Sequence, residues 1–299
     1  MTDAEDVRAF WQELGLPGLI DLHVHFLPPR IEAAVWREFD SEGDLIGRPW
    51  PIRYRGTAEE RRAFLGEAGV RRFPTLPYAH KPGVAGFLND WSRDLAAKEP
   101  AVLRSATFYP EPEAAAYVPE LVADGVRVFK AHLQVGAFHL DDPLLEPVWG
   151  TLAEAGTPIV VHAGSGPVGT PYTGSASTAR VLARHPRLRL VVAHMGAPEW
   201  EEFLVLAERH DSVLLDTSMA FSDFFADGHG AYPEDLVPRL GDLQDRVVWG
   251  SDFPTIPFAY REQLDGLAAL GLGDDWLRDV TWNNAVRLLD LESLGRSGG

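Results

Sequence analysis

Short apolar runs rich in β-branched residues alternate with amphipathic stretches along almost the whole chain. The runs predict eight strands, at 18–25, 70–78, 102–109, 126–131, 158–162, 188–194, 212–215 and 246–249. The stretches between them predict helices, among them 86–98, 113–123, 144–155, 176–183 and 199–209. Strands that alternate with helices are parallel, and eight of them can close on themselves, so the pattern predicts an α/β fold of the (β/α)8 TIM barrel type. A doubly wound open sheet is the alternative.

The segment after the first predicted strand interrupts this alternation. Residues 44–55 contain one glycine and two prolines, which predict a loop or a small hairpin inside an insertion at about 26–56. Thr57-Ala-Glu-Glu60 then has the pattern of a capping box. A helix is therefore expected to begin there, to run toward Ala68 and to end at Gly69.

Composition narrows the class of protein. The 299 residues suit one barrel domain over 1–299, with the barrel itself at about 18–290. The absence of cysteine excludes disulfides, a thiolate metal site and a cysteine nucleophile. A net charge of −17 argues against nucleic acid or an anionic membrane as partner. The acidic start and the lack of a long apolar run predict a cytoplasmic protein that acts on a small molecule, with a homodimer as a candidate assembly.

One glycine motif resembles a nucleotide-binding fingerprint. Gly164-Ser-Gly-Pro-Val-Gly169 fits G-x-G-x-x-G after a predicted strand. That fingerprint needs an acidic residue about 20 positions later for the ribose, and residues 165–198 contain no Asp or Glu. Pro167 and Pro171 also oppose a turn that leads directly into a helix. We therefore interpret the motif as a flexible loop.

Histidines and one carboxylate stand at the ends of predicted strands. His23 and His25 end the first strand and share a face, because strand side chains alternate. His162 and His194 end two further strands, and Asp252 follows the last. The carboxyl ends of all strands in a parallel barrel open onto one face, so these side chains are expected at one mouth. Nitrogen and carboxylate ligands without sulfur favour Zn²⁺, with Mn²⁺ or Fe²⁺ as alternatives.

The order of these motifs resembles the amidohydrolase superfamily, and most closely its amidohydrolase-related branch that includes aminocarboxymuconate-semialdehyde decarboxylase. The motifs are Asp21-Leu-His-Val-His25, His162, His194-Met-Gly196 and Gly250-Ser-Asp-Phe-Pro254. The resemblance implies a (β/α) barrel with one divalent metal ion, usually zinc. It implies His23, His25, His162 and Asp252 as the ligands. His194 would then stand beside the metal as an acid, a base or an electrophile.

Lys130 admits three interpretations. It lies on the predicted fourth strand, two residues before His132 and on the same face. Its ammonium group could orient the substrate or donate a hydrogen bond. Some members of the superfamily instead carboxylate a lysine on that strand to bridge two metals. The third interpretation is an ordinary structural ion pair.

Several other residues are expected to lie outside the catalytic site or have two possible roles. Five histidines are expected on the surface or in loops, namely His80, His139, His185, His210 and His229. Four aromatic residues of the insertion either line the pocket or form a small satellite core, namely Phe26, Trp36, Trp50 and Tyr54.

The expected activity is metal-dependent hydrolysis of a lactone, ester or amide. Asp252 would accept a proton from water, and His194 would stabilise an oxyanion or protonate the leaving group. Non-oxidative decarboxylation of an unsaturated or aromatic acid at the same metal is the alternative. A metal-binding protein without enzymatic activity is a third hypothesis, which the combination of a full ligand set with His194 disfavours.

Overall fold

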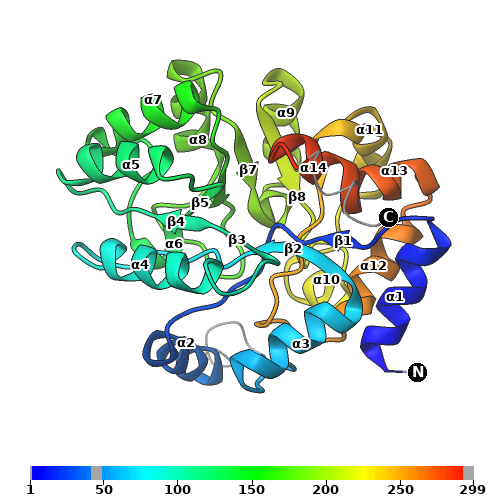
Figure 1. Ribbon diagram of the computed structural model, residues 1–299. Coiled ribbons are helices and arrows are strands. Elements are labelled where there is room, and N and C mark those ends of the chain that lie inside the picture. The colour runs from blue at the N-terminus through cyan, green and yellow to red at the C-terminus, as the bar shows by residue number, and fades with distance from the viewer. Residues whose placement is uncertain (1, 42–48, 292–299) are drawn as a thin grey trace.

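Parallel strands form the centre of the molecule, and helices surround them (Figure 1). The computed structural model describes residues 2–41 and 49–291. One sheet has the order β1-β2-β3, and the other has the order β4-β5-β6-β7-β8-β9. The strands are β1 (Leu19–Ile20), β2 (Val70–Pro74), β3 (Val102–Leu103), β4 (Ser105–Thr107), β5 (Val128–His132), β6 (Ile159–His162), β7 (Leu190–Val192), β8 (Val213–Asp216) and β9 (Val247–Val248).

The two sheets together make the predicted barrel of eight strand positions. Only Arg104 separates β3 from β4, so the strand predicted at 102–109 is present with an interruption. The segment after β1 meets the segment after β9, because the Leu22 amide donates to the Trp249 carbonyl at 2.9 Å. Val24 and Phe253 also form a parallel bridge. The fold is therefore a (β/α)8 barrel, as the alternation of elements predicts.

The helices predicted from the sequence pattern are present in the structure. All five ranges named as helical are helices within two residues at their starts and ends, if the 3₁₀ turn Pro143–Leu145 is counted with α7. The helices are α1 (Asp3–Glu13), α2 (Pro29–Ser41), α3 (Ala58–Ala68), α4 (Ala85–Ala96), α5 (Ala114–Ala123), α6 (Leu133–Gly136), α7 (Glu146–Ala155), α8 (Ser175–Arg184), α9 (Trp200–Arg209), α10 (Asp223–His229), α11 (Val237–Asp242), α12 (Tyr260–Ala269), α13 (Asp274–Arg278) and α14 (Asn284–Leu288). Thr57 and Glu60 form the expected capping box of α3, and Gly69 ends that helix with φ 86°.

The insertion differs from the prediction, because it contains the helix α2 rather than only a loop or a hairpin. Pro29 is its first residue, a position where proline costs no hydrogen bond. Ile31, Val35 and Phe39 recur at helical spacing. The glycine and prolines that predict a loop lie after this segment, at positions 47–51. Of the range 44–55, residues 44–48 lie outside the described residues, and 49–55 form neither helix nor strand.

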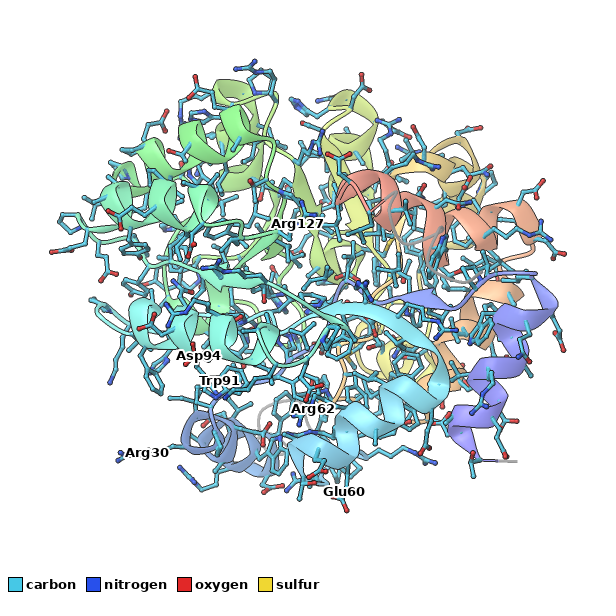
Figure 2. The ribbon with its side chains drawn as sticks, in the orientation of Figure 1. Arg30, Glu60, Arg62, Trp91, Asp94 and Arg127 are labelled. Carbon is cyan, nitrogen blue, oxygen red and sulfur yellow. The ribbon has the colours of Figure 1, made fainter. Side chains whose placement is uncertain are left out.

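One buried ion pair attaches α2 to α3. The Arg61 side chain is 2% exposed, and its Nη2 lies 2.5 Å from Oε1 of Glu32 on α2. The guanidinium also lies over the rings of Trp36 and Phe26, at 5.0 and 5.6 Å. α2 has no fully buried residue of its own, and it also contacts the rest of the protein through Phe39, whose ring lies 5.4 Å from that of Trp50. Outward-facing charges such as Arg30 and Glu60 project from α2 and α3 in Figure 2.

Side-chain alternation along the strands connects the core to the site. Val128 and Val160 pack in the smaller apolar cluster, whereas Phe129 and Val161 belong to the larger cluster that includes helix residues. Lys130 is two residues after Val128 and therefore shares its face. The first residues of these strands thus form an apolar layer inside the barrel, and the residues farther along the same face are polar. Within the described residues no helix is long and apolar enough to cross a membrane.

Candidate metal centre and active site

A cavity of about 590 Å³ lies at the carboxyl ends of the strands. All the predicted site residues line it, namely His23, His25, Lys130, His162, His194 and Asp252. They come from segments far apart in the sequence, which the barrel brings to one face. The convergence expected from the strand ends is therefore present.

Three of these residues have the geometry of a metal site. Nε2 of His23 and Nε2 of His25 are 3.1 Å apart. Oδ1 of Asp252 lies 3.4 Å from the first nitrogen and 3.1 Å from the second. Ligands about 2.1 Å from one tetrahedral ion are about 3.4 Å from each other, so the spacing matches a shared cation. Among the described residues this trio is the one group of three that could share an ion.

The hydrogen bonds of the two imidazoles point to the same conclusion. Nδ1 of His23 donates to Oδ2 of Asp216 at 2.5 Å, and Nδ1 of His25 donates to the Leu76 carbonyl at 3.0 Å. With Nδ1 protonated, each neutral ring carries its lone pair on Nε2. Burial lowers the pKa of His23, which favours this neutral form. Two lone pairs facing each other at 3.1 Å repel unless a cation lies between them.

Strained backbone is concentrated around this trio. Asp252 has φ 61°, His194 has φ 55° and Leu76, which accepts from His25, has φ 34°. Each such conformation costs a non-glycine residue about 1–3 kcal/mol and persists only where the surroundings impose it. Strain of this kind is typical of functional sites.

Asp21 connects the first strand to the segment that carries Asp252. Its carboxylate accepts hydrogen bonds from the amides of His23 and Ser251 at 3.0 and 3.1 Å. It also accepts from the hydroxyls of Ser251 and Tyr260, at 2.5 and 2.6 Å. Burial raises the pKa of Asp21 to about 7, and the two hydroxyls and the His23 amide oppose that rise. The network fixes the relative position of the first-strand histidines and Asp252.

Comparison with known proteins identifies the family of this chain. The amidohydrolase family model matches residues 20–291. The chain belongs to the amidohydrolase family. No curated protein matches the sequence significantly.

Solved structures show the same fold for this amidohydrolase. A TIM-barrel protein of Bordetella bronchiseptica, Bb4693, has a TM-score of 0.73 at 21% identity over 93% of this chain and 100% of its own. A 5-carboxyvanillate decarboxylase of Novosphingobium aromaticivorans, solved with manganese, has 0.62 at 15% identity over 91% and 96%. A probable 2-pyrone-4,6-dicarboxylic acid hydrolase of Acinetobacter baumannii has 0.58 at 14% identity over 91% and 99%. At these identities the likeness establishes the fold.

His194 lies beside the metal trio and outside it. It follows β7 in a short 3₁₀ segment, Ala193–Gly196. Its ring centroid is 5.0 Å from that of His23 and 4.9 Å from that of His162. Nδ1 lies 3.1 Å from the Ser218 carbonyl and 2.9 Å from the Ser218 hydroxyl, so the ring is held from one side. Burial lowers the pKa of His194, which leaves a neutral ring with its lone pair on Nε2.

His162 has a less direct relation to the trio. Its Nε2 donates to the Gly166 carbonyl at 2.8 Å, so in the neutral ring the lone pair is on Nδ1. The ring stacks on His132 at 4.1 Å. It is not among the three ligands that lie close enough to share an ion. Its assignment as a fourth ligand stays a prediction.

Lys130 approaches the trio closely. The side chain is fully buried, and Nζ lies 3.1 Å from Nε2 of His23. Burial lowers the pKa of Lys130 to about 8. Asp252 and Asp216 oppose this shift, because their negative charges favour the ammonium form. Because a free amine also reacts with carbon dioxide, the assignment of Lys130 as a substrate-orienting group instead of a bridging carbamate stays a prediction.

We expect one equivalent of metal per chain in the unmodified protein and in Lys130→Ala. The ligand trio does not include Lys130, so its loss should reduce turnover or raise KM instead of removing a metal. Metal content per chain, measured with and without added bicarbonate, checks this. Two equivalents in the unmodified protein that fall to one in the variant would establish the carbamate.

The groups that hold the ligands in place were not predicted from the sequence. Asp216 ends β8 after Val-Leu-Leu, which is the same signal as at His162, yet it was not singled out. Ser218 lies 3.0 Å from Nδ1 of His23 through its hydroxyl and thereby connects His23 with His194. Gly250 permits this packing, because a Cβ there would lie 2.2 Å from Oδ1 of Asp216 and 2.6 Å from Cβ of His23.

Removing Asp216 should weaken the metal site. Asp216→Ala deletes the acceptor that orients His23, and losses of this kind cost about 10–100-fold in metal affinity. Competition with a chromogenic chelator measures the affinity, with the exposed Asp211→Ala as matched control. Equal affinity in the two variants would show that Asp216 does not support the site.

The aromatic residues of the insertion and the remaining histidines lie partly at the cavity and partly outside it. Trp50 lines the cavity, whereas Tyr54 packs on Phe64 and Phe253, so both interpretations of the insertion's aromatic residues apply. Phe26 and Trp36 contact Arg61 and do not line the cavity. His80 is in the loop after β2, as expected, and it also lines the cavity. His139 lies on Tyr172, His185 contacts Glu146, His210 is partly buried after α9, and the side chain of His229 is outside the described part.

The glycine motif is an irregular loop at the cavity. Residues 164–169 contain neither helix nor strand, and Gly166, Pro167 and Val168 line the cavity. Ser165 donates its amide to the Glu199 carboxylate at 2.9 Å. The loop thus forms part of the cavity wall, and its Gly166 carbonyl accepts the hydrogen bond from His162.

Proposed function

We propose that this amidohydrolase is a metal-dependent hydrolase of a small organic lactone, ester or amide. The observation that carries the proposal is the trio of His23, His25 and Asp252, whose ligand atoms are spaced for one cation at the wall of a cavity. A divalent metal held there, with zinc as the first candidate and manganese or iron as alternatives, would polarise a carbonyl oxygen and lower the pKa of bound water. His162 is the candidate for a fourth ligand through Nδ1.

Proton transfer is assigned to His194 in this proposal. Although burial works to raise the pKa of Asp252, the neighbouring imidazoles of His25 and His23 hold that pKa well below its usual range. A carboxylate so stabilised is a weak base. Nε2 of His194 carries a free lone pair, so it can accept a proton from water and return it to the leaving group.

The cavity wall indicates the size and polarity of the substrate. Away from the trio it is mainly apolar, with Ile31, Val35 and Phe39 from α2 facing Trp50 and Phe225. A cavity of about 590 Å³ is within the range of sites for small organic ligands. We infer a substrate with a ring or other compact apolar body and one polar reacting group. A small molecule is accordingly the proposed partner.

Lys130 supports decarboxylation as a second candidate function. Its Nζ lies next to His23 in the buried end of the cavity, where an ammonium could receive the carboxylate of an unsaturated or aromatic acid. The apolar wall would favour the loss of charge as carbon dioxide leaves.

One assay separates the two functions. Metal-loaded protein is incubated with a panel of lactones, esters, amides and aromatic acids, while proton release and carbon dioxide are followed together. The expected result is proton release from a lactone or ester, or amine release from an amide, without carbon dioxide and lost in His194→Asn. Carbon dioxide evolution would establish the second function, and neither product from a metal-loaded protein would contradict both.

A further inference from the structure

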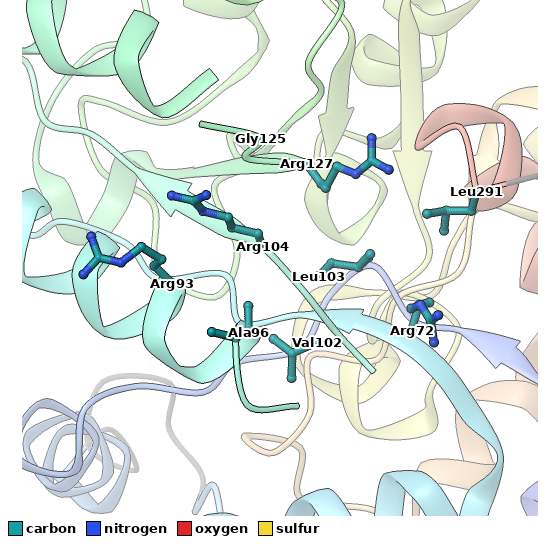
Figure 3. Close-up of a pocket in the computed structure, with 10 residues that line it drawn as sticks. Arg72, Arg93, Ala96, Val102, Leu103, Arg104, Gly125, Arg127 and Leu291 are labelled. Carbon is teal, nitrogen blue, oxygen red and sulfur yellow. The ribbon is translucent and has the colours of Figure 1, made fainter. Parts of the chain in front are cut away.

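A second cavity, of about 450 Å³, is lined by four arginines, namely Arg72, Arg93, Arg104 and Arg127 (Figure 3). Arg104 lies between β3 and β4, and Arg127 directly precedes β5. The cavity therefore lies toward the amino ends of these strands, away from the carboxyl ends that carry the metal trio. None of the residues that line it belongs to the site described above.

The charge in this cavity is unusual for the protein. The whole chain has 44 acidic and 27 basic residues, yet no acidic side chain is among the residues that line the cavity. Arg104 pairs with Asp124, and Arg93 pairs with Asp90 and Asp94. Arg72 and Arg127 have no carboxylate partner within the described part of the chain.

Arg127 is exposed to solvent and Arg72 is partly buried, and both line the same cavity. The Arg72 side chain donates through Nη1 to the Arg71 carbonyl at 2.8 Å, and burial lowers its pKa. The wall between the arginines is apolar, from Val102 and Leu103, and Leu291 closes one side. A low-dielectric wall strengthens both the repulsion among the guanidinium groups and their attraction for an anion.

No salt bridge within the described residues neutralises these two guanidinium groups, so both can bind an anion. A dianion bound in the cavity would neutralise both charges, since arginine forks bind phosphate and carboxylate oxygens in bidentate fashion. We propose that this arginine cavity binds a small dianion, a phosphate or a dicarboxylate, through Arg72 and Arg127. The proposal concerns a different end of the barrel and does not depend on the proposed function.

Calorimetric titration of the metal-loaded protein tests this proposal, with inorganic phosphate and succinate as separate probes at constant ionic strength. The comparison is between the unmodified protein, Arg72→Gln/Arg127→Gln, and a charge-matched control, Arg187→Gln/Arg209→Gln. The control arginines are exposed and line neither cavity. Phosphate bound at the metal would be common to all three proteins, so the difference between them reports the arginine cavity.

We expect saturable binding of one dianion, weakened at least tenfold in the cavity variant and unchanged in the control. The tighter of the two probes identifies the source as phosphate or dicarboxylate. Metal content and basal turnover should be the same in all three proteins. Equal affinity in the cavity variant and the control, or no binding beyond that at the metal, would overturn the proposal. If the double variant does not fold, the two single variants decide by the same comparison.

Discussion

Alanine at both His23 and His25 should reduce bound metal from about one equivalent per chain to near zero, since two ligands of the trio are lost together. Activity should disappear with the metal. The barrel should stay folded, because these side chains lie at the cavity wall and the apolar cluster inside the strands does not use them. Metal analysis and circular dichroism on the same preparation measure both effects.

The matched control for this variant is His139→Ala/His210→Ala, which removes two histidines outside the cavity. Its metal content should equal that of the unmodified protein. Tight stoichiometric metal in the His23→Ala/His25→Ala protein would show that the trio is not the site.

His194→Asn should keep its metal and lose turnover by about 10²–10⁴-fold, the range expected when a general acid–base group is removed. The structure places His194 next to His23 but outside the trio, with Nδ1 bound to Ser218. Asparagine can retain a donor to the Ser218 carbonyl, so the fold around it should persist.

His162→Asn is the paired variant, and it should lose metal affinity along with activity if His162 supplies the fourth ligand. Metal content and kcat measured side by side separate the two roles. A metal-free His194→Asn beside a fully loaded His162→Asn would mean that the two assignments are reversed.

The strand ends made much of the site predictable from the sequence. His162 and Asp252 each follow an apolar run, and a parallel barrel delivers such residues to one face whatever the loops between them do. The same argument applied to Asp216 would have found the carboxylate that holds His23. This part of the site follows from the period-two pattern and the topology alone.

Long-range contacts explain what the sequence did not predict. α2 packs on α3 through the pair of Glu32 with Arg61, a residue 29 positions away that no local pattern indicates. His80 has no periodic pattern that places it at the cavity, because its position depends on the turn after β2. The four arginines come from β2, from α4, from the residue between β3 and β4 and from the residue before β5, so their separate positions in the chain give no sign of a shared cavity.

Anomalous diffraction from crystals of the protein purified without chelator tests the central claim most directly. The metal trio predicts one peak per chain, about 2.0–2.2 Å from Nε2 of His23, Nε2 of His25 and an oxygen of Asp252. The absorption edge of the same crystals identifies the element. A peak at other side chains, or chelator-free protein with no metal at this position, would contradict the account.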